Sequence, residues 1–237
     1  MTVTYQLDGA GVARVRMDDG KANVLGDASC TRLREAMARA AEDRAAALVL
    51  EGRDGMFSGG IDREVLRDDD AVRRAATLAH IAHTLLAVWT APIPTVAAVT
   101  GHAIAGGAIL AMACDRRIGV GGSFKLGVNE SMLGMVLPTW AMAIIEGTVP
   151  TAHRTEVMLM GCLFDPAGAA RVGILDEVVA ADGFDDAVRE AATGLAEVPT
   201  RAYAGNKRML RGARAEVAAA LVAAEMGPGF AKDARTR

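Results

Sequence analysis

The sequence predicts an α/β protein, and two observations support this class. Short apolar runs that are typical of buried strands occur at residues 46–51 and 95–100, and another strand is expected at 116–120. Segments with helical spacing of apolar residues lie between them. Because strands alternate with helices in the first half of the chain, the pattern indicates an α/β fold.

The first half of the chain contains most of the expected strands. Alternating apolar and polar residues around the turn Asp8–Gly11 predict a β-hairpin, and Pro92 and Pro94 end a long helix. The expected elements are hairpin strands at 3–7 and 13–17, a helix from Asp27 or Ser29 to about Glu42, a strand at 46–51, a glycine-rich loop at 52–62, helices at 63–66 and 72–89, and strands at 95–100 and 116–120.

The second half is mostly helical by its pattern. After Pro138 we expect helices near 139–147, 151–160, 166–171, 184–197, 200–211 and 214–226, with one short strand at 174–179. No linker or low-complexity segment divides the chain, and the part after Pro199 is interpreted as a helical appendage used in assembly.

Composition excludes several classes of protein. A chain of 237 residues predicts one domain, or one domain with a small appendage. The formal net charge is −3, and no clustered basic face indicates a nucleic-acid partner. No unbroken apolar run is long enough to span a membrane, and the N-terminus lacks a signal peptide. The three cysteines are scattered without metal-binding spacing, so we expect a cytoplasmic protein without a metal site.

The stretch at 103–115, AIAGGAILAMACD, predicts a tight loop followed by a buried helix. Amides at the start of a helix have no partner inside it, and Gly106 allows a ligand to approach its N–H closely. The site is therefore suited to an anion, or to an oxygen that becomes one. The alternative is a core helix that merely contains glycines.

A second glycine-rich loop, GRDGMFSGGID at 52–62, also leads into a helix. Two such loops can each direct one amide at a common point, which would form an oxyanion hole around a carbonyl oxygen. Glu130 is the only carboxylate from Ser123 to Ala143, and desolvation there would raise its pKa and favour acid or base chemistry. The alternative is a loop carboxylate that faces water or pairs with Lys125.

These motifs together resemble the crotonase (enoyl-CoA hydratase/isomerase) superfamily. FSGGID at 57–62 and VTGHAIAGGAILAMACDRRI at 99–118 are its paired loops, and the resemblance extends over nearly the whole chain. LGVNESMLGMVLP at 126–138 and GCLFDPAGAARVGILDEVV at 161–179 are similar to the Δ3,Δ2-enoyl-CoA isomerase branch. The resemblance implies a crotonase-like spiral of ββα units in residues 1–190 and a C-terminal helical trimerisation region in 191–237.

The resemblance also implies a ligand, an assembly and a set of site residues. The ligand would be an acyl-CoA thioester, the assembly a homotrimer or a hexamer built as a dimer of trimers, and no cofactor would be needed beyond the coenzyme A of the substrate. The N–H groups of Ile61 and Gly106 match the oxyanion-hole positions, and Glu130 matches a catalytic glutamate. Expected substrate or CoA contacts are Lys21, Ala22, Asn23, Ser58, Gly59, Gly60, Asp62, Arg63, Gly107 and Leu133, with Phe230 and Lys232 as possible contacts from the tail.

One departure from the family pattern bears on the reaction. Hydratases that this chain resembles carry a glutamate where it has Ile109, and they use two carboxylates to position and activate one water. A single base suffices to move a proton between two carbons. The expected function is therefore isomerisation of a 3-enoyl-CoA to a 2-enoyl-CoA. The alternatives are an enoyl-CoA hydratase or another crotonase-type lyase or hydrolase, a non-catalytic acyl-CoA-binding homologue, and a purely structural trimer.

Overall fold

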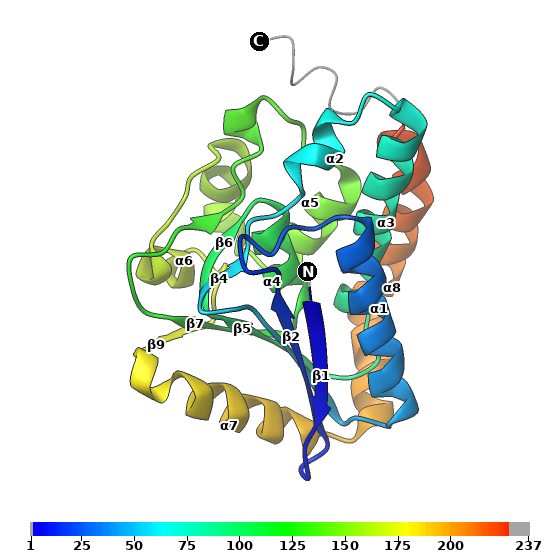
Figure 1. Ribbon diagram of the computed structural model, residues 1–237. Coiled ribbons are helices and arrows are strands. Elements are labelled where there is room, and N and C mark those ends of the chain that lie inside the picture. Colours follow the sequence, from blue (N-terminus) through cyan, green and yellow to red (C-terminus); the bar gives the residue numbers. More distant parts are fainter. Residues whose placement is uncertain (1, 228–237) are drawn as a thin grey trace.

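Two β-sheets of unequal size form the centre of the structure, a computed structural model that describes residues 2–227 (Figure 1). The larger sheet contains β1 (Thr2–Leu7), β2 (Val12–Asp18), β3 (Ala47–Glu51), β5 (Thr95–Val99), β7 (Arg116–Val120) and β9 (Glu177–Val179), in that order. Only β1 and β2 pair antiparallel, as the expected hairpin. The smaller sheet contains β4 (Gly55–Ser58), β6 (Gly101–Ile104) and β8 (Leu126–Gly127), all parallel.

The chain winds through these sheets as a spiral of ββα units, as the family resemblance implies. Each of β3, β5 and β7 is followed by a strand of the small sheet, and a helix then follows. The helices of the core are α1 (Asp27–Glu42), α2 (Arg63–Arg67), α3 (Ala71–Trp89), α4 (Gly106–Ala113) and α5 (Thr139–Glu146). This winding places the ends of β4, β6 and β8 side by side at one edge of the small sheet.

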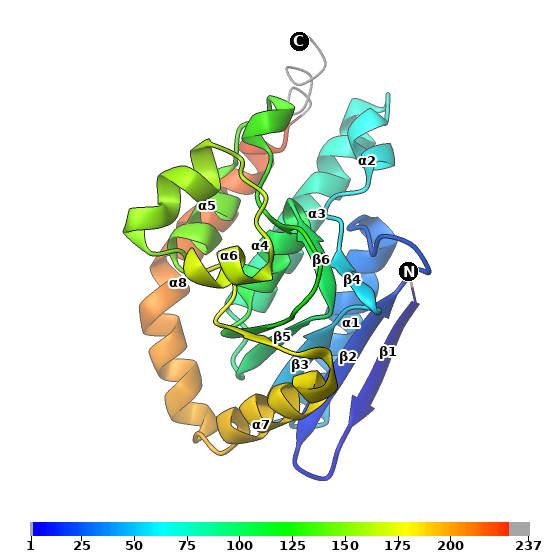
Figure 2. The same ribbon diagram turned by 90° about the vertical axis from the view of Figure 1, so that its left-hand side faces the viewer.

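The larger sheet is covered on both faces. Helix α7 (Phe184–Ala196) packs across one face, where Phe184 and Val188 contact apolar residues of the parallel strands (Figures 1 and 2). The main core lies on the other face, against α1, α3 and α4, and is built almost entirely from Ala, Val, Leu, Ile and Met. Parallel strands buried on both faces explain why β3 and β5 are continuous apolar runs.

The C-terminal region is one long helix, α8 (Thr200–Glu225), which packs on α3 and α5 (Figure 2). The expectation of two helices, 200–211 and 214–226, is wrong. An interior glycine costs a helix only about 1 kcal/mol, and the burial of Ala215, Ala218 and Val222 offsets that cost across Gly212. Residue 190, the expected boundary of the C-terminal region, lies inside α7.

Two further differences from the sequence-based expectation are local. The residues of β4, β6 and β8 were expected to be loops, because strands of two to four residues with glycines carry no alternating pattern. In place of a helix at 151–160 there is a 3₁₀ turn at Thr151–His153 and a π-helical turn at Thr155–Leu159. Helix α6 (Pro166–Arg171) has its expected bounds, and Asp165 caps it through the Gly168 N–H.

Within residues 2–227, no helix combines the length and apolarity needed to cross a bilayer.

A buried ion cluster fastens α8 to the larger sheet. The Asp115 carboxylate accepts hydrogen bonds from the Thr95 N–H (2.8 Å) and hydroxyl (3.0 Å) at the start of β5. It also pairs with Lys207 and Arg211 of α8, each at 2.7 Å, and the three charged side chains are 5–13% exposed. Because Asp115 is the shared anion, its loss would leave two buried cations without an anionic partner.

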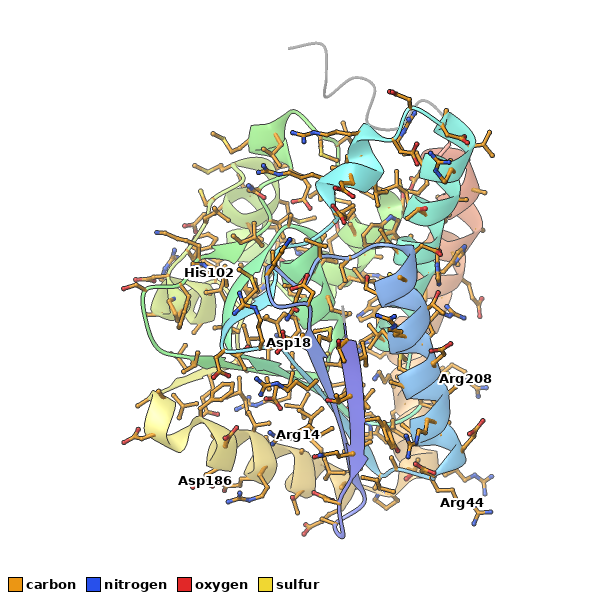
Figure 3. All side chains as sticks on the ribbon, in the orientation of Figure 1. Arg14, Asp18, Arg44, His102, Asp186 and Arg208 are labelled. Carbon is orange, nitrogen blue, oxygen red and sulfur yellow. The ribbon has the colours of Figure 1, made fainter. Side chains whose placement is uncertain are left out.

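We therefore expect Asp115→Asn to lower the free energy of unfolding by about 3–5 kcal/mol. Asp186→Asn is the matched control, because Asp186 is an exposed carboxylate on α7 that pairs only with its neighbour Arg189 among the described residues (Figure 3). Such an exposed pair contributes about 0.2–1 kcal/mol. Urea unfolding of both variants measures the difference, and equal losses would show that the cluster does not fasten α8.

Candidate active site

The two glycine-rich loops that the sequence singles out lie against each other. They follow β4 and β6, which are neighbouring parallel strands of the small sheet. Gly60 has φ +87°, and a Cβ built there would lie 2.7 Å from the Ile104 carbonyl oxygen and 3.0 Å from the Gly106 nitrogen. A glycine is therefore required at position 60, both by its backbone conformation and by the second loop.

The amides of Ile61 and Gly106 border one small space. Gly106 is the first residue of α4, so its N–H has no acceptor within the helix. The Leu25 N–H donates to the Gly60 carbonyl, and the Leu25 carbonyl accepts the Asp62 N–H. The Ile61 N–H takes no part in this strand-like pairing. A Cβ built on Gly106 would lie 3.5 Å from the Ile61 nitrogen, and no hydrogen bond within residues 2–227 uses either amide. The two donors can therefore hold one oxygen.

Close packing and a strained residue hold this pair of amides in place. A Cβ on Gly107 would lie 2.1 Å from the Ser58 carbonyl oxygen, so α4 begins in direct backbone contact with the end of β4. Ala105, immediately before α4, has φ +54° and ψ −127°, a conformation that L-residues rarely adopt. Such strain costs of order 1–3 kcal/mol and is typical of functional sites.

The loop at Lys21–Asn23 supports the first glycine loop. The Gly59 N–H donates to the Ala22 carbonyl and the Ser58 hydroxyl to the Asn23 carbonyl, both at 2.7 Å. The Asn23 side chain is fully buried, and its Nδ2 donates to three carbonyl oxygens, those of Met17, Met56 and Phe57. Its side chain therefore builds the loop and is not free for a ligand.

The remaining expected contact residues lie around the same loops. Asp62 caps α2 by accepting the Glu64 N–H at 2.9 Å. Lys21 and Arg63 are exposed cations beside the loops, and Leu133 is an exposed apolar residue. Leu25, whose two backbone bonds fix the first loop, was not predicted, because nothing in its sequence context marks it. Phe230 and Lys232 lie outside the described residues.

Glu130 reaches the same edge of the small sheet from β8. Gly127 pairs with Ile104, and its carbonyl accepts the Ala105 N–H at 2.8 Å, so the chain leaves β8 beside the second glycine loop. Glu130 is 9% exposed, and its Oε2 has no hydrogen-bond partner. Burial raises the pKa of this carboxyl to about 7. The alternative expectation, a carboxylate that faces water or pairs with Lys125, is wrong.

Other groups near the site are structural or apolar. His102 lies on β6 (Figure 3), where its Nδ1 accepts the Lys125 N–H at 2.9 Å and its ring packs edge-on against Phe124. Ile109 is fully buried in α4. In the described part of the chain, no group of three or more His, Cys, Asp or Glu side chains is placed to hold a metal ion.

Comparisons with known proteins identify the family of the chain. A sequence profile described as "Enoyl-CoA hydratase/isomerase" matches residues 8–227. The mouse protein "Enoyl-CoA delta isomerase 1, mitochondrial" is 28% identical over 210 residues, which cover 87% of this chain and 73% of that protein. "Probable enoyl-CoA hydratase EchA17" of Mycobacterium bovis is 35% identical over 179 residues, 73% of this chain and 68% of that one.

Comparison of the fold with solved structures finds members of the same family. The crystal structure of human mitochondrial Δ3-Δ2-enoyl-CoA isomerase superposes with a TM-score of 0.92 and 27% identity, and the match covers all of this chain and 93% of that one. The matching profile extends over most of the chain, and the spiral fold, the paired glycine loops and the buried glutamate are those that the sequence motifs imply. The chain therefore belongs to the enoyl-CoA hydratase/isomerase, or crotonase, family.

Proposed function

We propose that this protein is an enoyl-CoA isomerase that moves a double bond from C3 to C2 of an acyl-CoA thioester. The observation that carries the proposal is Glu130, a buried carboxyl without a hydrogen-bond partner on Oε2, in the segment that leaves β8 beside the second glycine loop. A group with a pKa near 7 can both remove a proton and return it at neutral pH.

The proposed reaction needs one base and one oxyanion hole. The thioester oxygen of a 3-enoyl-CoA accepts the N–H groups of Ile61 and Gly106, and Glu130 removes a proton from C2. The negative charge moves onto the oxygen, where each amide contributes about 3–4 kcal/mol of barrier lowering. Protonated Glu130 then donates the same proton to C4, which yields the conjugated trans-2-enoyl-CoA and restores the carboxylate.

Hydration is the rival reaction, because one of the relatives is named as a probable hydratase. Syn-hydration requires a water held and activated by two carboxylates in this family. Position 109 holds a buried isoleucine, which cannot bind or orient a water. A single carboxyl, without a second group to hold a water, favours proton transfer within the substrate. A protein that binds acyl-CoA without turnover is the second alternative.

The remaining features of the proposal concern the ligand and the assembly. Lys21 and Arg63 are exposed beside the glycine loops, which supports the proposal that these two cations bind the CoA phosphates. The reaction as written needs no metal or redox cofactor, since the coenzyme A is part of the substrate. By analogy with the family, we infer a homotrimer, or a hexamer built from two trimers. The proposal of a cytoplasmic location is supported only by the scattered cysteines of the sequence.

The first test is turnover of a trans-3-enoyl-CoA, followed by the absorbance of the conjugated product, with hydration of a 2-enoyl-CoA measured beside it. We expect isomerisation to exceed hydration by about a hundredfold or more, and Glu130→Gln to lower kcat at least about a thousandfold. Dissociation constants for the product, measured by calorimetry, should change little in Glu130→Gln, because glutamine retains the size of the side chain.

Each contrary result has its own meaning. Faster hydration than isomerisation would show that another group replaces the second carboxylate. Binding of acyl-CoA without either activity would identify a binding protein. Near-normal turnover in Glu130→Gln would exclude Glu130 as the base.

Adjacent glycines provide a second test, of the oxyanion hole. We expect Gly106→Ala to fold, because the nearest atoms to the new methyl group lie 3.3–3.5 Å away, yet this methyl group would occupy the space beside the Ile61 nitrogen. Its kcat/KM should fall by about 10²–10³. In Gly107→Ala the methyl group would lie 2.1 Å from a backbone oxygen, so that variant should be unstable. Thermal unfolding and activity of both variants separate the two effects, and an active Gly106→Ala would place the oxyanion hole elsewhere.

The raised pKa of Glu130 predicts two pH dependences. As a base, the free enzyme needs the carboxylate, so kcat/KM should rise with pH and level off above about 7. The folded-state pKa lies above the ordinary value of 4.5, so the stability from this group is complete below about 4.5 and is lost as pH rises through 7. Glu130→Gln should therefore unfold less readily than the wild type at pH 8.5, by about 2–3 kcal/mol. Equal stability of both proteins at that pH would show that Glu130 is solvated.

A further inference from the structure

The loop that carries Glu130 is fastened to distant parts of the chain at several points. At its start, Leu126 and Phe164 exchange two backbone hydrogen bonds, at 2.8 and 2.9 Å. In its middle, the Ser131 hydroxyl donates to the Met158 carbonyl at 2.9 Å, within the π-helical turn. The Met135 N–H donates to the Glu130 carbonyl at 2.9 Å, and this hydrogen bond closes the turn between the two residues.

The end of this loop is held by Glu225, in the last turn of α8. The Thr139 N–H donates to Glu225 Oε2 at 2.9 Å, and the Thr139 hydroxyl donates to Oε1. Thr139 is the first residue of α5, and Pro138 before it has no side-chain acceptor that could cap the helix. A carboxylate supplied from another helix therefore satisfies an otherwise free amide and lies at the positive end of the helix dipole.

Helix α8 is itself held at its other end. Lys207 and Arg211 pair with Asp115, and Arg211 also donates to the Trp89 carbonyl at 2.8 Å. Between Arg211 and Glu225, the helix buries Ala218 and Val222. The core therefore fixes the position of Glu225. Through its hydrogen bonds with Thr139, Glu225 can in turn fix the end of the loop before α5.

We propose that Glu225 is a positioning residue for Glu130: by capping α5 it holds the catalytic loop in the position that keeps the Glu130 carboxyl buried beside the glycine loops. The proposal rests on the proposed function for the role of Glu130 in turnover. The buried state of Glu130, however, is a property of the fold and can be measured without a substrate. Loss of the cap would let the loop move outward and admit water to the carboxyl.

The test compares three substitutions with a matched control on the same helix. Glu225→Ala removes both acceptors, Glu225→Gln retains one, and Thr139→Val removes only the hydroxyl donor. Glu216→Gln is the control, because Glu216 is an exposed residue of α8 whose side chain makes no hydrogen bond or ion pair among the described residues. The measurements are kcat and KM, the melting temperature, and the titration of Glu130 by NMR of protein labelled with ¹³C-glutamate. Glu130→Gln assigns the Glu130 signal.

For Glu225→Ala we expect kcat to fall about tenfold with KM nearly unchanged, as for a small displacement of a catalytic group. The pKa of Glu130 should move from about 7 toward its ordinary value, because water reaches the carboxyl. Burial raises this pKa and a hydrogen bond from the backbone of Glu130 opposes the rise, so a loss of burial should lower the pKa. Glu225→Gln and Thr139→Val should show smaller effects in the same direction, and Glu216→Gln none.

The outcomes separate this proposal from the proposed function. A lower melting temperature with an unchanged Glu130 titration in every variant would overturn the positioning role and leave Glu225 as a purely structural cap. If the wild type lacks isomerase activity but the Glu130 titration still moves in Glu225→Ala, the positioning role stands and the proposed reaction fails. If Glu225→Ala does not fold, the titrations of Glu225→Gln and Thr139→Val decide the question.

Discussion

The direct contact between Gly107 and the Ser58 carbonyl oxygen is the constraint on which the site depends. It leaves no room for any side chain at position 107, and it brings the first turn of α4 onto the end of β4. This close approach is what places the Gly106 amide next to the Ile61 amide. Since both donors are backbone groups at the ends of short strands, their spacing is determined by the packing of the sheet and not by any side-chain rotamer.

The site is less stable than an equivalent piece of core would be. Glu130 is buried without a partner for Oε2, and Ala105 has a strained backbone, and each costs stability. The surroundings offset this through the buried Asp115 cluster, the dense aliphatic core and the Glu225 cap on α5. The groups that cost stability are thus concentrated at the candidate site, and the groups around them have their hydrogen bonds and ion pairs satisfied. This distribution is typical of enzymes, in which activity is gained at the expense of stability.

Much of this arrangement could be predicted from the sequence, and what could not has a physical reason. The buried strands, the hairpin and the helices carry local periodicity, and the paired glycine loops identify Ile61 and Gly106 as neighbours through the family resemblance. The short strands β4, β6 and β8 depend on pairing between distant segments, so no local pattern marks them. The same holds for Leu25, for the strain at Ala105 and for Glu225, whose partner Thr139 is 86 residues away.

The choice between isomerisation and hydration depends on water more than on the scaffold, because one crotonase fold supports several reactions of a stabilised enolate. A hydratase must keep a water ordered beside its substrate, and this requires polar groups on both sides of it. Here the position that would supply the second carboxyl is a buried isoleucine, and burial of Glu130 raises its pKa to about 7. Such a carboxyl is suited to take a proton from one carbon of the substrate and release it to another. The same desolvation that makes Glu130 costly to the fold therefore makes it competent as the single acid and base of the proposed reaction.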